Sequence, residues 1–237
     1  MPAYEVSLRD RQPVAEGTMA FHFDKPSGFQ FKAGQFIRLT LMDPPETDAE
    51  GNGRTFTIAS APVEEDLIVA TRLRDTAFKR VLKSMPLGSP VKLQGPFGAL
   101  TLHEDAARSA VFLAGGIGIT PFRSIALQAA RAALSHPIWL FYANRRPEDA
   151  AFLEELRQLE AENTNYRFIA TMTRPEEAWA GERGHITKEM LSKFIDDLAA
   201  PIYYTAGPPA MVDAMMSLLI AAGVSSGQIR AEQFAGY

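Results

Sequence analysis

The chain of 237 residues contains no cysteine. This absence excludes disulfide bonds, thiolate catalysis, cysteine-based zinc sites and a cysteine-ligated iron-sulfur cluster within the chain. Any such cluster has to reside on a partner. The four histidines, His22, His103, His136 and His185, show no spacing typical of metal ligands. We therefore predict no metal site, and we expect these histidines on the surface or in loops.

Long apolar runs and a strong excess of basic residues are also absent. No stretch approaches the roughly 20 apolar residues that a membrane-spanning helix needs. The N-terminus lacks the basic flank and apolar run of a signal peptide. The formal net charge is −4, whereas nucleic-acid binding favours a clustered excess of lysine and arginine. We therefore expect a cytoplasmic protein that binds neither nucleic acid nor a membrane.

What the chain does contain is a change of pattern near residue 104. Before it, short segments with strand character are separated by turns rich in glycine and proline, a pattern typical of a small antiparallel barrel. One helix is expected in this region, over residues 77–84. The predicted strands span residues 4–9, 19–24, 35–42, 54–59, 67–73 and 90–94.

After residue 104, apolar runs of strand length alternate with amphipathic stretches of helical length, which is typical of a parallel sheet covered by helices. The predicted strands span 110–114, 138–143, 166–172, 202–206 and 229–234, and the predicted helices span 121–134, 147–162, 187–199 and 208–222. The length and the 46% hydrophobic content allow two domains. We predict an antiparallel Greek-key β-barrel over residues 1–104 and a Rossmann-like, nucleotide-binding α/β domain with a parallel sheet over 105–237.

A glycine-rich turn opens the second predicted domain. The apolar strand 110–114 is followed by Gly115-Gly116-Ile117-Gly118-Ile119-Thr120-Pro121 and then by a predicted helix. Small residues let the backbone approach a pyrophosphate closely, Thr120 is expected to cap the helix, and Pro121 suits its first turn. The pattern also fits a turn that merely needs glycine, because Pro121 and Phe122 stand where the fingerprint G-x-G-x-x-G has its third glycine.

Further motifs lie on both sides of this turn. The segment Arg54-Thr55-Phe56-Thr57-Ile58 alternates like a strand, which by itself also fits an edge strand with one solvated arginine. The other motifs are Thr71-Arg72-Leu73-Arg74-Asp75-Thr76-Ala77-Phe78-Lys79, Gln94-Gly95-Pro96-Phe97-Gly98 and Tyr204-Thr205-Ala206-Gly207-Pro208-Pro209. In their order and spacing these motifs resemble those of the ferredoxin-NADP reductase superfamily, and the resemblance covers nearly the whole chain.

The resemblance implies an enzyme with a flavin-binding barrel, a nucleotide-binding domain and no iron-sulfur domain. Such a reductase takes a hydride from NADH or NADPH onto bound FAD and passes electrons to an external acceptor, such as a ferredoxin, a flavodoxin, an oxygenase component or a small molecule. FAD rather than FMN is expected from the resemblance alone. Two alternatives stay open: a flavin- and nucleotide-binding subunit with little turnover, and a barrel that has lost its flavin.

The resemblance also implies roles for residues of the barrel. Arg54 is expected to pair with the FAD pyrophosphate, Phe56 to lie against the flavin or its ribityl chain, and Thr57 to offer its hydroxyl to flavin N5. The adenylate and pyrophosphate are expected beside a strand and a helix start, at Val69, Thr71, Ala77, Phe78 and Lys79. Lys79 stands where many members have serine or threonine. Its charge either replaces the lost hydroxyl bond to the pyrophosphate, or the side chain points into solvent.

In the second domain the resemblance places the dinucleotide on Gly115, Gly116, Gly118 and Pro121, with Thr120 also near the flavin. Residues that directly follow strands are expected beside the adenosine ribose and the nicotinamide: Asn144, Arg145, Thr173, Arg174, Gly207 and Pro208. The first four also fit loop residues in water. NADH and NADPH are equally expected, because arginines such as Arg145, Arg146 and Arg174 occur near the ribose in both classes of enzyme.

Ala206 stands where many members have a cysteine beside the nicotinamide, which predicts slower hydride transfer rather than loss of nucleotide binding. The expected catalytic residues are Thr57, Thr120 and Ala206. At the C-terminus, Phe234 or Tyr237 is expected over the flavin, since several members place a terminal aromatic there. A last strand whose aromatic side chain caps the core is an equally good interpretation.

Overall fold

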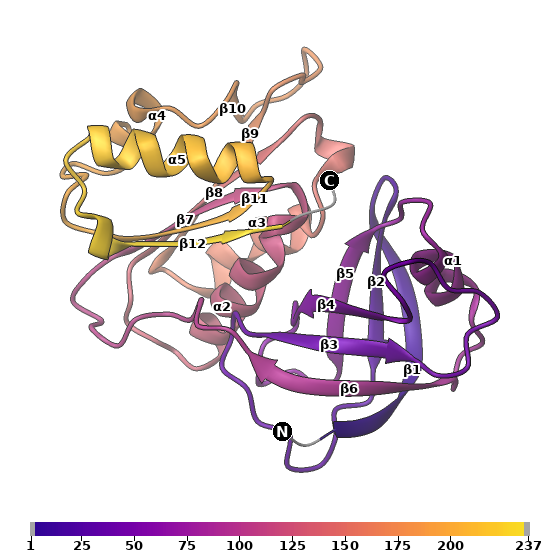
Figure 1. The fold of residues 1–237 in the computed structure, drawn as a ribbon. Coiled ribbons are helices and arrows are strands. Elements are labelled where there is room, and N and C mark those ends of the chain that lie inside the picture. Colours follow the sequence, from indigo (N-terminus) through magenta and orange to yellow (C-terminus); the bar gives the residue numbers. More distant parts are fainter. Residues whose placement is uncertain (1–2, 235–237) are drawn as a thin grey trace.

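The computed structural model describes residues 3–234 of the chain. Two lobes lie side by side, one built from strands and the other from a sheet flanked by helices (Figure 1). The first lobe contains β1 (Ala3–Ala15), β2 (Thr18–Phe23), β3 (Phe36–Leu41), β4 (Gly53–Thr57), β5 (Leu67–Arg72) and β6 (Pro90–Phe97). The second contains β7 (Ala110–Gly115), β8 (Ile138–Asn144), β9 (Tyr166–Met172), β10 (Glu182–Arg183), β11 (Ile202–Gly207) and β12 (Ile229–Gln233).

The first sheet is antiparallel, with the strand order β4-β3-β6-β1-β2-β5. The long strand β1 pairs with β6 through its first part and with β2 through its second, so it belongs to both sides of the curled sheet. Between the two edge strands, the Ala59 N–H donates a hydrogen bond to the Ile68 carbonyl at 2.7 Å. Apolar side chains fill the interior, among them Phe21, Phe23 and Leu39. The predicted barrel is confirmed.

Helix α1 (Ala77–Ser84) follows β5 and has the predicted bounds. Thr76 caps it, because its side chain accepts a hydrogen bond from the Lys79 N–H at 3.4 Å. The buried face of α1 consists of Ala77, Phe78, Val81 and Leu82, at the spacing of one helix face. The helix lies at one end of the barrel (Figure 1), and the ring of Phe78 in its first turn packs against Phe56 of β4.

The second sheet is parallel, with the strand order β10-β9-β8-β7-β11-β12. Helices α2 (Thr120–Arg131) and α3 (Leu153–Glu162) pack through one apolar cluster, and α4 (Lys188–Ser192) and α5 (Pro209–Ala221) pack through another. The predicted α/β fold is confirmed. The domain boundary at residue 104 falls between β6 and β7 and stays a prediction.

The four helices of the second lobe are shorter than the sequence predicts, and α3 and α4 are shortened most. Residues 147–149 form a separate 3₁₀ turn, and Phe152, with a left-handed φ of 60°, precedes α3. The predicted helix 187–199 is reduced to α4. Near its expected end, the Asp197 side chain accepts a hydrogen bond from the Ala199 N–H at 2.9 Å, which is a local alternative to a helical bond. Strand β10 had no counterpart among the predicted strands.

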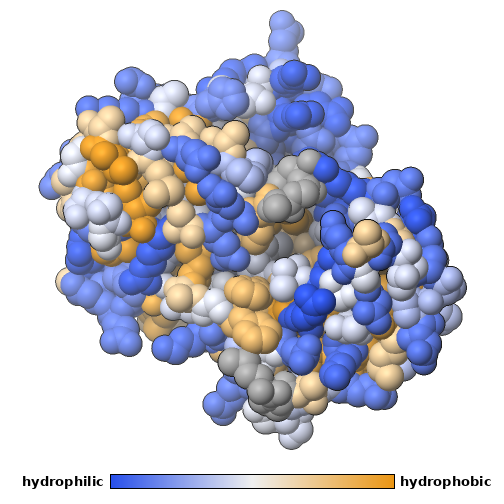
Figure 2. Space-filling model, in the orientation of Figure 1, coloured by the Kyte–Doolittle hydropathy of each residue, from blue (hydrophilic) through white to orange (hydrophobic). Residues whose placement is uncertain are grey.

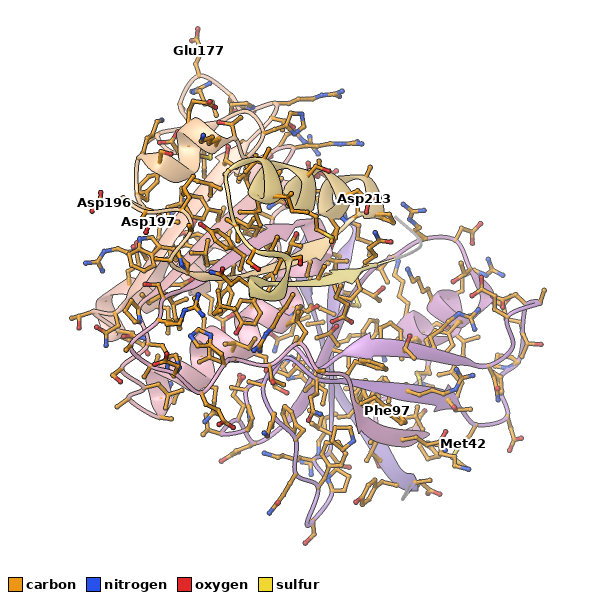
Figure 3. The ribbon with its side chains drawn as sticks, turned by 60° about the vertical axis from the view of Figure 1, so that its left-hand side comes forward. Met42, Phe97, Glu177, Asp196, Asp197 and Asp213 are labelled. Carbon is orange, nitrogen blue, oxygen red and sulfur yellow. The ribbon has the colours of Figure 1, made fainter. Side chains whose placement is uncertain are left out.

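The surface of the second lobe differs between its sides. Hydrophobic residues gather over α5 in Figure 2, where Ile220 is 54% exposed. Acidic residues project outward on the side away from the barrel, among them Glu177, Asp196 and Asp197 (Figure 3).

Among residues 3–234, no helix combines the length and the apolar character that a membrane span requires.

His103, His136 and His185 lie in connecting segments, as expected, whereas His22 lies in β2. His103 and His136 are nevertheless buried. The His103 ring nitrogens lie 2.9 Å from the Tyr204 hydroxyl and 3.0 Å from the Arg108 carbonyl. His136 Nε2 lies 2.9 Å from the His103 carbonyl. These contacts tie the connection between β6 and β7 to strand β11, and hydrogen bonding offsets the cost of burying the rings.

We expect the protein to lose stability as the pH falls below about 6.5, the usual pKa of histidine. His103 donates to the Arg108 carbonyl and accepts the Tyr204 hydroxyl, an arrangement that needs the neutral ring. Burial lowers the pKa of His103. A folded pKa below the unfolded one stabilises the protein above the unfolded pKa, and this stability is lost as the pH falls.

Urea unfolding at about pH 8 and about pH 5.5 measures this effect. In His103→Gln, which cannot titrate at this position, the drop in unfolding free energy between the two pH values should be smaller than in the wild type. An equal drop in both proteins would show that His103 does not carry the effect.

Candidate active site

A pocket of about 410 Å³ opens where the barrel meets the second lobe. Its walls come from β4, β5, the start of α1, the turn before α2 and the residue after β12. The predicted residues that line it are Arg54, Phe56, Thr57, Thr71, Lys79, Thr120 and Phe234. The lining residues that were not predicted are Glu50, Thr55, Ala70, Arg72, Arg74, Thr76 and Ile117. Segments far apart in the chain thus meet in one cavity.

Arg54 stands in the pocket wall with its guanidinium already engaged. Its Nη2 lies 2.6 Å from Asp48 Oδ1, and its Nε lies 3.0 Å from Glu50 Oε2. Nη1 donates to the carbonyls of Glu50, Gly51 and Gly53 at 2.8–3.1 Å. The Arg54 side chain is 18% exposed. Arg54 therefore organises the turn from 48 to 53 while it faces the pocket.

The carboxylate of Asp48, beside the pocket, marks a place where the protein stabilises a negative charge. The hydrogen bond from Arg54, and further bonds from the backbone amides of Glu50 and Phe78, lower the pKa of the Asp48 carboxyl. Phe78 belongs to the first turn of α1, where backbone amides and the helix dipole favour negative charge. Its ring lies 5.3 Å from the Arg54 guanidinium and 5.7 Å from the ring of Phe56. An arginine, a helix start and an aromatic pair therefore converge at one place.

Lys79 supplies the pocket with a cation whose one nearby carboxylate, Glu50, interacts with it without forming an ion pair. Its ammonium forms no ion pair or hydrogen bond within residues 3–234. Burial lowers the pKa of Lys79, and the neighbouring charges of Arg74 and Arg54 lower it further. Arg74 also lines the pocket and has no ion-paired carboxylate in the same range. This wall therefore has positive charge in excess, which suits phosphate groups.

The Thr57 hydroxyl is a buried polar group that is suited to bond a ligand. Its Oγ1 is buried and has no hydrogen-bond partner among residues 3–234, and the residue is 6% exposed. Leaving such a group unpaired costs about 1–3 kcal/mol. Since Thr57 also lines the pocket, a ligand there is in a position to satisfy this hydroxyl.

Three predicted barrel residues do not line the pocket with their side chains. Val69 is buried in the barrel core, and Ala77 and Phe78 are buried on the inner face of α1. The predicted contacts of Ala77 and Phe78 involved their amides, which lie at the start of the helix. Any contact of Val69 with a ligand in this pocket has to come from its backbone as well.

The glycine turn contains an element that was not predicted. Residues Gly116–Ile119 form a 3₁₀ turn between β7 and α2, and Gly116 has a left-handed φ of 52°. Thr120 is therefore the first residue of α2 rather than its cap, because Ile119 already has helical dihedral angles. The Thr120 hydroxyl donates to the Ile117 carbonyl at 3.1 Å. The prediction of a threonine cap is wrong, although Thr120 does face the pocket.

The turn touches the end of β11 at Gly118. A Cβ at this position would lie 2.2 Å from the Ala206 carbonyl oxygen and 2.6 Å from the Gly207 nitrogen. Ala206 itself is fully buried. The structure thus brings Gly118, which the resemblance places on the dinucleotide, against Ala206 and Gly207, which it places near the nicotinamide. Only a residue without a side chain fits at 118.

Phe234, the residue after β12, lines the pocket, and β12 itself runs along the edge of the second sheet beside β11 (Figure 1). The Phe234 N–H donates to the Gly207 carbonyl at 3.0 Å. The preceding residue, Gln233, donates to Asp213 Oδ1 of α5 at 2.7 Å; Asp213 is labelled in Figure 3. Phe234 is therefore fixed between β11 and α5, while Tyr237 lies outside the described residues.

Some of the residues missed by the sequence reasoning carried a signal. Arg72, Arg74 and Thr76 lie within the motif from 71 to 79, so the same motif predicted their neighbours. Glu50 lies in a polar loop whose course depends on Arg54, and no motif includes it. Glu232 has no local signal either: it pairs in register with Ala206, and burial raises the pKa of its carboxyl.

A second group of predicted residues lies at the carboxyl ends of β8 and β9. Arg174 donates its N–H to the Arg145 carbonyl at 2.8 Å, so the two residues are neighbours. The side-chain nitrogen and oxygen of Asn144 are buried and lack partners within residues 3–234. Asn144, Arg145, Thr173 and Arg174 do not line the pocket but share the sheet edge with the glycine turn. In open parallel sheets this edge is where ligands bind.

Comparison with known proteins supports an oxidoreductase. A family model described as an oxidoreductase NAD-binding domain matches residues 112–217. The reductase component of propane 2-monooxygenase from Rhodococcus jostii is 27% identical over 216 residues, or 89% of this chain and 57% of that protein. Ferredoxin–NADP reductase B from Sorangium cellulosum is 28% identical over 227 residues, or 91% of this chain and 89% of that protein. The chain spans 57–64% of the length of the first of these relatives and of two further ones.

Solved structures share the fold over nearly the whole chain. A ferredoxin NADP⁺ reductase from Neisseria gonorrhoeae with bound FAD and NADP is similar at a TM-score of 0.82 and 23% identity, covering 98% of both chains. The FAD/NAD-binding domain of nitric oxide dioxygenase from Vibrio cholerae is similar at a TM-score of 0.83 and 20% identity, covering 97% of this chain and 98% of that one. The structural likeness shows the fold. In sequence and in fold the chain is similar to reductases of the ferredoxin-NADP reductase type.

Proposed function

We propose that this protein is a flavin-dependent reductase that takes a hydride from a nicotinamide nucleotide onto FAD and passes the electrons to an external acceptor. The observation that carries the proposal is the pocket between the lobes, where Thr57 of the barrel and Thr120 of the second lobe face the same space. The names of the relatives favour an oxygenase component or a ferredoxin as the acceptor. We also propose that the protein works in the cytoplasm.

The residues of the pocket fit FAD. The buried Thr57 hydroxyl is available to a ring nitrogen, and Phe56 offers an aromatic face. The unpaired cations Lys79 and Arg74, together with Arg54 at the start of α1, match the two negative charges of a diphosphate. The volume of about 410 Å³ lies within the range of small-molecule sites, which runs from about 300 to 1,000 Å³. When bound, FAD supplies the hydride and electron chemistry.

We propose that the second lobe holds the nucleotide along the carboxyl edge of its sheet. Gly118 allows the turn to lie against β11, and the Asn144 amide is available to a ribose. Ala206 leaves room beside the nicotinamide without adding a thiol. In this arrangement Thr57 orients the flavin, while the Thr120 hydroxyl holds the turn through its bond to Ile117.

Charge favours NADPH over NADH as the donor. Arg145 and Arg174 are exposed neighbours, and neither forms an ion pair within the described part of the chain. Arg146, by contrast, is paired with Glu16 at 2.6 Å and with Asp149 at 3.2 Å. Two guanidinium groups without carboxylate partners match the 2′-phosphate that only NADPH carries.

An anaerobic titration of the yellow holoprotein with NADPH and with NADH tests the proposal. NADPH is expected to bleach the flavin, and its Kd should be about tenfold or more below that of NADH. This difference corresponds to one charge-assisted hydrogen bond to the 2′-phosphate. Arg174→Ala should remove most of this difference, whereas Arg157→Ala, on an exposed face of α3, should retain it.

The outcomes separate the alternatives. A flavin that neither nucleotide bleaches contradicts the reductase and favours a binding subunit with little turnover. A protein that stays colourless with added FAD contradicts flavin binding altogether. Equal responses to both nucleotides contradict only the preference for NADPH.

A further inference from the structure

A buried polar junction joins the two lobes beside the pocket. Arg123 of α2, whose side chain is 5% exposed, is paired with Glu64 at 3.1 Å and with Glu155 at 2.5 Å. Glu64 belongs to the connection between β4 and β5 of the barrel, and Glu155 belongs to α3. The Arg123 guanidinium therefore links the barrel, α2 and α3 at one point.

Hydrogen bonds to the barrel backbone complete this junction. Arg123 Nη1 donates to the Ala59 carbonyl at 2.7 Å, and Ser124 Oγ donates to the Ser60 carbonyl at 2.6 Å. Ser60 and Ser124 are fully buried. We call the set of Arg123, Ser124, Ala59, Ser60, Glu64 and Glu155 the Arg123 junction.

The Arg123 junction lies close in sequence to residues in two walls of the pocket. Ala59 lies two residues after Thr57, and Arg123 lies three residues after Thr120, which is about one helical turn. Thr57 and Thr120 line the pocket, whereas Arg123 does not. The backbone that carries Thr57 is thus bonded directly to the helix that begins with Thr120.

We propose that Arg123, assisted by Ser124, is a positioning residue that sets the gap between the flavin and the nicotinamide. This inference rests on the proposed function. Hydride transfer needs reacting atoms about 3–3.5 Å apart, and a displacement of about 1 Å costs about a hundredfold in rate. The short bonds to Ala59 and Ser60 fix the barrel wall relative to α2.

Burial makes the Arg123 junction a rigid contact. Leaving a buried guanidinium without its carboxylates is strongly unfavourable, so separating Arg123 from Glu64 and the Ala59 carbonyl of the barrel would be costly. The side chains of Glu64 and Glu155 are 30% and 39% exposed, so water can solvate them in a variant that lacks Arg123. Replacement of Arg123 therefore loosens the junction without leaving a fully buried carboxylate.

The test compares binding with transfer in the holoprotein. Arg123→Met is expected to keep the Kd values of FAD and NADPH within about threefold, but to slow flavin reduction in stopped flow about tenfold or more. The charge-transfer absorbance of reduced flavin with NADP⁺, which reports ring contact, should fall in parallel. Arg123→Lys, which keeps the charge, should recover part of the rate. Arg131→Met, on the same helix but in an exposed ion pair at 3.3 Å, should behave as wild type.

A readout independent of turnover is amide hydrogen exchange in the flavin-free protein. Exchange over residues 57–60 should be faster in Arg123→Met and in Ser124→Ala than in the wild type. If Arg123→Met does not fold, Ser124→Ala and Arg123→Lys carry the test.

Unchanged reduction rates and unchanged exchange in these variants overturn the positioning role. A wild-type flavin that no nucleotide reduces contradicts the proposed function, and the faster exchange would then show a junction that is only structural.

Discussion

Gly118→Ala is expected to slow nucleotide-dependent reduction of the flavin about a hundredfold. The new Cβ would lie 2.2 Å from the Ala206 carbonyl oxygen and 2.5 Å from its carbon. Both atoms belong to the backbone of β11, a strand that is hydrogen-bonded on both sides. Either the glycine turn or the strand end has to move, and each is proposed to hold the nicotinamide.

Gly115→Ala is the matched control for this substitution. A Cβ at 115 would meet the sulfur of Met211 at 2.1 Å and Pro208 Cδ at 3.1 Å. The sulfur lies near the end of a flexible side chain that can rotate away. The loss at 115 should therefore be only a few-fold, or about 1 kcal/mol. Stopped-flow reduction and flavin occupancy are measured for both variants. Wild-type rates in Gly118→Ala would show that the turn does not position the nucleotide.

Arg54→Met is expected to weaken FAD binding by the apoprotein about a hundredfold. The variant loses the guanidinium at the start of α1 and also the bonds that hold the turn from 48 to 53. Lys79→Met, which removes charge alone, should weaken binding about tenfold. Asp48→Asn should strengthen binding, because the Asp48 carboxylate occupies the same guanidinium that the diphosphate requires.

Riboflavin and Arg80→Met serve as controls for the Arg54 prediction. Riboflavin lacks phosphate, so its affinity should change little in Lys79→Met and Asp48→Asn. Arg80 is paired with Glu46 at 2.6 Å and also with Asp75, and it does not line the pocket, so its loss should leave FAD affinity unchanged. Fluorescence quenching of FAD measures each Kd. Equal binding by wild type and Arg54→Met would contradict the proposed pyrophosphate site.

Local patterns predicted much of the fold because they depend on neighbours in the chain. The bounds of α1 agree with the structure, since the apolar spacing and the cap at Thr76 are both local. The helix predicted at 187–199 ends at Ser192, and near its expected end the side chain of Asp197 accepts a hydrogen bond from a backbone amide instead. Apolar periodicity alone does not contain that hydrogen bond.

The site was predictable only where a motif carried it. Arg54, Thr57 and Thr120 each belong to a motif, and each lines the pocket. The Arg123 junction joins residues that are 59 and 32 positions apart, Arg123 with Glu64 and with Glu155. Neither carboxylate stands in a pattern that distinguishes it from other surface acids, so their convergence becomes visible only in three dimensions.

The pocket takes its walls from the middle of the barrel, from the glycine turn and from Phe234 after the last strand. A nascent chain therefore lacks one wall until residue 234 has emerged from the ribosome. This wall is complete only when β12 is paired with β11. A chain truncated before β12 would therefore lack the side of the pocket that Phe234 supplies.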